Sequence, residues 1–78
     1  MVVDGALSIG GTLIATGRCS LVRGNVPKRG TLLGGTHSLL KYDSITLVLE
    51  NGQKSTIVPR RIEFLADQPP LLVFDVMV

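Results

Sequence analysis

The feature that most constrains the fold of this chain is the placement of its glycines. Eight of its nine glycines lie within the first 35 of 78 residues. An interior glycine destabilises a helix by about 1 kcal/mol relative to alanine, so this density argues against helices in the first half. In strand-rich segments glycine instead marks turns, bulges and barrel corners. The glycines therefore predict a β-rich segment with several sharp bends.

The strongest local pattern is an Asn-Gly pair between two runs that contain many β-branched residues. Asn51 and Gly52 separate residues 45–50 from residues 53–58. Asn-Gly favours a two-residue type I′ turn, because both turn residues need positive φ. The pattern predicts a β-hairpin with a type I′ turn at Asn51-Gly52.

The same turn predicts the register of the hairpin. A two-residue loop would place Leu49 opposite Lys54 and Ile45 opposite Val58. The side chains of Ile45, Leu47, Leu49 and Val58 would then form one apolar face. We expect this face to belong to the core.

Alternating apolar residues and turn signals mark further short strands. The candidate strands are 6–16, 19–23, 31–33, 60–65 and 71–78. The Gly10-Gly11 pair is interpreted as a bulge or bend within the first of them, although the pattern leaves open whether that segment is one bent strand or two. The spacing predicts a single all-β domain over residues 1–78. We expect a five- or six-stranded antiparallel barrel or sandwich of SH3-like or OB-like size.

The composition of so short a chain predicts a partner. Hydrophobic residues make up 45% of the chain and charged residues only 18%, against about 25% charged residues in average soluble domains. Small domains commonly add disulfides, metals or oligomerisation to a marginal core. A single cysteine cannot form an intrachain disulfide. One cysteine and one histidine also do not supply the four ligands of a structural zinc site. We therefore expect a homo-oligomer without metal or cofactor.

The candidate strand 71–78 is apolar on both faces apart from Asp75. Such a strand is buried on both faces, either at the centre of a sheet or at a subunit interface. A strand at an interface could add to a neighbouring sheet by β-augmentation. The predicted interface residues are Leu71, Leu72, Val73, Phe74, Val76 and Val78.

A basic segment is the best candidate for ligand binding. Arg18, Arg23, Lys28 and Arg29 occur with no acidic residue between them. The chain through residue 41 carries five basic residues and one acidic residue, whereas residues 42–78 carry three basic and five acidic residues. These four residues could bind nucleic acid or another polyanion. A solvated loop or an intersubunit salt-bridge patch explains the segment equally well.

Other side chains limit the ligand-binding hypothesis. Phe64 and Phe74 are expected in the core, which leaves Tyr42 as the one aromatic residue available for stacking on a base. Arg60 and Arg61 are adjacent in a strand, and we expect them to point to opposite faces. They would then not bind one ligand together.

No catalytic constellation is evident. Cys19, His37 and Asp43 are the obvious nucleophile, base and orienting group, but a triad depends on geometry rather than on the presence of its members. The leading interpretation is a non-enzymatic structural, assembly or protein-interaction subunit. The single cysteine, the absence of a signal-peptide pattern at the N-terminus and the short apolar runs predict a cytoplasmic protein with no membrane segment.

Overall fold

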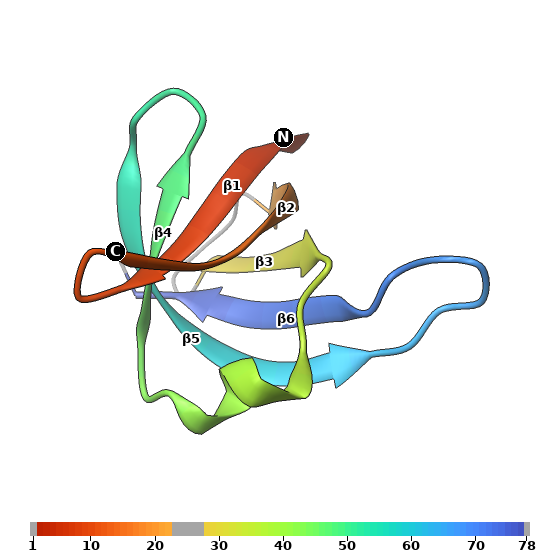
Figure 1. Ribbon diagram of the computed structural model, residues 1–78. Helices are drawn as coiled ribbons and strands as arrows, with labels where there is room; N and C mark the ends of the chain where they lie inside the picture. The colour runs from red at the N-terminus through yellow and green to blue at the C-terminus, as the bar shows by residue number, and fades with distance from the viewer. Residues whose placement is uncertain (1, 23–27, 78) are drawn as a thin grey trace.

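Six antiparallel strands and one short 3₁₀ helix make up the computed structural model, which describes residues 2–22 and 28–77. The elements are β1 (Val2–Ile9), β2 (Thr12–Val22), β3 (Lys28–Leu33), η1 (His37–Lys41), β4 (Ile45–Leu49), β5 (Lys54–Glu63) and β6 (Leu71–Val76). The strands form a closed barrel in the order β1-β2-β3-β6-β5-β4 (Figure 1). The predicted all-β antiparallel fold is confirmed, and of the two predicted architectures it is the barrel and not the sandwich.

The barrel consists of two three-stranded meanders. Strands β1, β2 and β3 form the first, strands β4, β5 and β6 form the second, and η1 lies on the connection between them. β1 pairs with β4, and β3 pairs with β6. Each described strand therefore has a neighbour on both sides. Closure of this kind removes the exposed sheet edges that promote strand addition and aggregation.

The N-terminal segment is a hairpin of two strands, so the interpretation of Gly10-Gly11 as a bulge or bend was wrong and, of the two arrangements left open, the segment adopts the second. Gly10 and Gly11 have φ values of 56° and 84°, and Ile9 pairs with Thr12 across them. Two consecutive residues with positive φ between paired strands are the signature of a type I′ loop. Glycine adopts this conformation at no steric cost. The tightest hairpin of the chain thus lies at Gly10-Gly11.

The β4–β5 hairpin is present, but its loop contains three residues instead of two. Leu49 N–H donates to Gln53 O and Gly52 N–H donates to Leu49 O, each at 2.8 Å. Gly52 has a φ of 88°, whereas Asn51 is not among the residues with positive φ. The Asn51 side chain instead accepts a hydrogen bond from Gln53 N–H at 2.9 Å. The predicted type I′ turn is therefore replaced by a loop with one left-handed glycine.

The extra loop residue changes the face that β5 presents to the core. Ile45 pairs with Ile57, not with Val58 as predicted. Ile57 is fully buried while Val58 is half-buried, because a register shift of one residue exchanges the two faces of a strand. The predicted inward direction of Ile45, Leu47 and Leu49 is confirmed.

A compact set of apolar side chains fills the barrel. No charged or polar side chain is buried among residues 2–21 and 29–77. The buried residues are Leu7, Cys19, Leu32, Leu39, Ile45, Leu47, Leu49, Ile57, Leu72 and Phe74. They come from all six strands and from η1, so every element contributes to one core.

Two glycines, one in β1 and one in β2, allow close approaches that a side chain would prevent. Gly5 pairs with Gly17. A Cβ atom on Gly5 would lie 3.1 Å from Leu47 Cδ1 and 3.2 Å from Cys19 Cβ, and a Cβ atom on Gly17 would overlap the Leu33 carbonyl oxygen. The missing side chains thus let β1 lie close to the core at Gly5 and let β2 lie close to the backbone of β3 at Gly17.

This contact predicts that Gly17→Ala destabilises the fold more than Gly5→Ala. The Gly17 variant should lose about 3 kcal/mol or more of unfolding free energy, because a backbone carbonyl in a ladder cannot move aside. The Gly5 variant should lose about 1 kcal/mol, because the methyl ends of side chains can shift. Urea unfolding monitored by circular dichroism measures both. An equal loss in the two variants would contradict the close approach at Gly17.

Candidate functional site

Of the predicted basic segment, the structure describes the side chains of Arg18 and Arg29, and these two lie apart. Arg18 lies on β2, where its Nη1 contacts Asp4 Oδ1 of β1 at 3.1 Å. Arg29 lies on β3 opposite Val22, which places it about 13 Å along the barrel from Arg18, given 3.3 Å per strand residue. Arg23 lies outside the described residues, and of Lys28 the structure describes the backbone alone. Arg18 and Arg29 therefore lie on two different parts of the surface.

Arg29 lies near Arg60, which was not part of the predicted basic segment. Arg29 Nε lies 3.7 Å from Asp75 Oδ1, and Arg60 Nε lies 2.6 Å from Asp75 Oδ2. Asp75 is on β6, between β3 with Arg29 and β5 with Arg60. Its side chain is only 15% exposed. A nearly buried carboxylate therefore holds two exposed guanidinium groups, one on each oxygen.

A bulge in β5 directs two adjacent arginines outward. Pro59 pairs with Phe74 and Arg61 pairs with Val73, so Arg60 is the extra residue. Pro59 is buried, whereas Arg60 and Arg61 are both exposed. The expectation that they point to opposite faces was therefore wrong, because a bulge interrupts the alternation of a strand. Arg61 Nε contacts Glu63 Oε1 at 2.9 Å.

We call this surface the arginine face. It comprises Arg29, Arg60, Arg61, Glu63 and Asp75 on the outer side of β3, β5 and β6. Three guanidinium groups and two carboxylates give these residues a formal charge of +1. The charge is small, and the arrangement of the arginines matters more than their number.

The predicted interface strand lies within the barrel. β6 is paired with β3 on one side and with β5 on the other over Leu71–Val76, so β-augmentation has no free edge there. Leu72 and Phe74 are fully buried in the core of the same chain. The side chains of Leu71, Val73 and Val76 are half-buried, and Val78 lies outside the described residues. The central position of the strand accounts for much of its apolar character.

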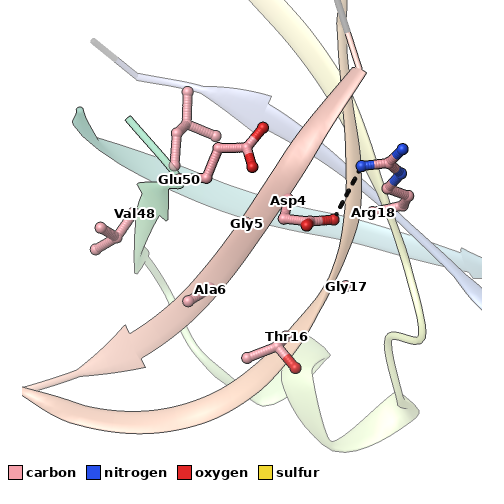
Figure 2. Close-up of a pocket in the computed structure, with 9 residues that line it drawn as sticks. Asp4, Gly5, Ala6, Thr16, Gly17, Arg18, Val48 and Glu50 are labelled. Atoms are coloured by element: carbon pink, nitrogen blue, oxygen red, sulfur yellow. Dashed lines mark hydrogen bonds and ion pairs between the residues drawn. The ribbon is translucent and has the colours of Figure 1, made fainter. Parts of the chain in front are cut away.

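A groove of about 470 Å³ lies over β1, β2 and β4 (Figure 2). The Gly5–Gly17 pair and the Asp4–Arg18 ion pair both belong to its lining. The lining residues are Asp4, Gly5, Ala6, Thr16, Gly17, Arg18, Val48, Leu49 and Glu50. This lining contains one hydroxyl group, two carboxylates and one guanidinium group, and it supplies no nucleophile with an adjacent base.

The side chains considered for catalysis differ in burial. Cys19 is fully buried in the core, and burial raises the pKa of its thiol to about 11. His37 is exposed on η1, where its ring lies 5.3 Å from the ring of Phe64. Asp43 is exposed in the loop before β4. A neutral thiol inside the barrel is not available as a nucleophile at neutral pH.

The described residues also lack two further features, a metal site and a membrane-spanning helix. Residues 2–22 and 28–77 hold no group of three His, Cys, Asp or Glu side chains that could bind a metal ion. In the same residues no helix has the length and apolar character to cross a membrane. Tyr42, the candidate for stacking, is half-buried, and Lys41 Nζ lies 5.2 Å from its ring centroid. One face of that ring is therefore already in contact with a cation.

The exposed apolar surface was not found from the sequence. Phe64, which we expected in the core, is 67% exposed, and Leu65 is 45% exposed. Both belong to the connection 64–70, which extends away from the barrel between β5 and β6 (Figure 1). β5 ends at Glu63, so the alternation that suggested an inward Phe64 no longer applies there. The other predicted core aromatic, Phe74, is fully buried.

No protein-family model matches the chain, and searches of curated proteins and of solved structures gave no significant match. The function is therefore inferred from the geometry of the barrel and its surface.

The burial of Cys19 predicts slow alkylation in the native state. At pH 8 the thiol is protonated and inaccessible, so iodoacetamide should label the folded protein about 100-fold more slowly than the chain in denaturant. Mass spectrometry over a time course measures both rates, with glutathione as a control for the reagent. Equal rates in the folded and unfolded protein would contradict the inward position of Cys19.

Proposed function

We propose that this domain is a non-enzymatic assembly module that forms a homo-oligomer through the connection between β5 and β6. We call residues 64–70 the projecting loop. The observation that carries the proposal is the exposure of Phe64 and Leu65 on this loop. Burying a side chain of this size contributes about 1.5–3 kcal/mol. Two such side chains side by side favour a protein contact.

The loop has features that lower the entropic cost of association. Pro69 and Pro70 restrict its backbone, and Pro70 O accepts a hydrogen bond from Gly34 N–H at 2.8 Å. The contact between the rings of His37 and Phe64 limits the positions of the phenylalanine side chain. A surface that is ordered before binding loses less conformational entropy when it associates.

The closed barrel directs association to side chains. All described strands are paired on both sides, which leaves strand addition without a free edge. Hydrophobic residues make up 45% of the chain, and several large apolar side chains remain exposed at the protein surface. A self-complementary contact through one loop would give a closed symmetric dimer, the commonest homo-oligomer.

The non-enzymatic part of the proposal is supported by the chemistry of the side chains. The groove over β1, β2 and β4 has no paired nucleophile and base in its described lining, and Cys19 is enclosed in the core. The single cysteine favours a reducing compartment, so we place the assembly in the cytoplasm.

Replacing Phe64 and Leu65 with serine should weaken self-association by tenfold or more, about 1.4 kcal/mol. Both side chains are exposed, so the Phe64→Ser/Leu65→Ser variant should keep the barrel and its thermal stability. Light scattering coupled to size exclusion, over a concentration series, measures the mass of wild type and variant.

The matched control is Leu13→Ser, which removes a side chain that is 61% exposed on the β1–β2 hairpin, away from the projecting loop. This variant should assemble as wild type does. A monomeric wild type would refute the assembly proposal. Dissociation caused by Leu13→Ser alone would move the contact to the β1–β2 hairpin.

A further inference from the structure

The arginine face has a second feature, which concerns the atoms that its arginines use. Arg29, Arg60 and Arg61 each contact a carboxylate through Nε. Arg18, on the other part of the surface, contacts Asp4 through the terminal Nη1. The three arginines of the face therefore share a geometry that Arg18 does not have.

Contact through Nε leaves the terminal nitrogens of a guanidinium group available. Nε carries one of the five N–H donors, and the two Nη atoms carry the other four. Within residues 2–22 and 28–77, no hydrogen bond or ion pair engages the Nη atoms of Arg29, Arg60 or Arg61. The donor pairs with which arginine binds oxyanions thus remain free.

Asp75 contacts two of these groups, Arg60 through a hydrogen bond of 2.6 Å and Arg29 through a longer ion pair of 3.7 Å. Arg29 and Arg60 come from strands on either side of β6, about 10 Å apart at the backbone given the spacing between strands. Both Nε atoms lie at the same carboxylate, so the two guanidinium groups converge over β6. Because the side chain of Asp75 is 85% buried and belongs to the middle strand, it is a rigid anchor. An anchored arginine loses less conformational entropy when it binds.

We propose that Arg29 and Arg60, positioned by Asp75, bind a phosphate group through their Nη atoms. Two guanidinium groups over one carboxylate leave a local charge of +1, which attracts an anion. The planar donor pairs match the tetrahedral oxygens of phosphate. The site is separate from the projecting loop and does not depend on assembly. It also differs from the predicted basic segment, because it contains Arg60 and lacks Arg18.

The experiment is an NMR titration of the full chain with inorganic phosphate, observed at the Nε–H signals of the arginines. Sodium chloride at the same ionic strength is the reference. The signals of Arg29 and Arg60 should shift and saturate with phosphate, whereas the signal of Arg18 should not. Equal shifts for all arginines, or equal shifts with chloride, would overturn the proposal.

The deciding variant is Arg60→Lys, which keeps the charge and removes the planar donor pair. If positioned guanidinium groups bind the phosphate through their donor pairs, this substitution of an exposed residue should weaken phosphate binding at least fivefold. Arg18→Lys is the matched control and should leave binding unchanged. Equal binding by Arg60→Lys and wild type would show that charge alone is responsible, and this result would overturn the proposal.

Asp75→Asn tests whether Asp75 positions the arginines, because loss of positioning and simple electrostatics predict opposite changes in phosphate binding. Removing the carboxylate raises the local charge to +2, so simple electrostatics predicts tighter binding of phosphate. Loss of positioning predicts weaker binding, and weaker binding in a variant of unchanged melting temperature supports the proposal. Tighter binding would overturn the role of Asp75. Arg60→Lys still decides the proposal if the Asn variant fails to fold.

A short DNA duplex in place of inorganic phosphate identifies the source of the phosphate group. Binding of the duplex that competes with phosphate and is weakened by Arg60→Lys assigns a nucleic-acid backbone. Binding of phosphate without the duplex assigns a small phosphate-bearing molecule. Absence of saturable binding in both titrations would overturn the proposal.

Discussion

The pairing of β1 with β4 is the interaction on which the rest of the structure depends. Residues Gly5 to Ser8 pair with Leu49 to Thr46, and this ladder joins the two meanders on one side of the barrel. Closure encloses an apolar interior and leaves outward side chains and loops as the surfaces for binding. Two bulges, at Ile14 in β2 and at Arg60 in β5, supply the bending that a closed small barrel requires.

The bulge in β5 also determines the chemistry of the surface. It places Arg60 beside Asp75 and turns Arg61 outward. The same pair of strands continues into the projecting loop with Phe64 and Leu65. The β5–β6 hairpin thus combines an apolar end with a cationic surface along its length. The opposite side of the barrel carries the groove with the Asp4–Arg18 pair.

Local patterns in the sequence predicted the fold class and the existence of the β4–β5 hairpin. They did not predict its register, because an Asn-Gly pair is compatible with both a two-residue and a three-residue loop, and a difference of one residue decides whether Ile57 or Val58 faces the core. Gly10-Gly11 carried a signal for a type I′ turn that was interpreted as a bulge. Correct weighting of that dipeptide would have separated β1 from β2.

The surfaces were harder to predict, because they depend on which strands are neighbours. Arg29, Arg60 and Asp75 are distant in the sequence and meet only because β6 lies between β3 and β5. The exposure of Phe64 depends on the end of β5 at Glu63, which the apolar alternation of residues 60–65 did not reveal. Strand pairing and the positions of strand ends both depend on residues that are distant in the sequence, so local patterns predict them poorly.

The most direct test of the central claim is a dilution series of the unmodified protein followed by amide NMR. Self-association through the projecting loop predicts concentration-dependent shifts at residues 64–70 and at the neighbouring His37, with constant signals on β1 and β2. Shifts absent at every concentration, or confined to Leu71–Val76, would contradict the account.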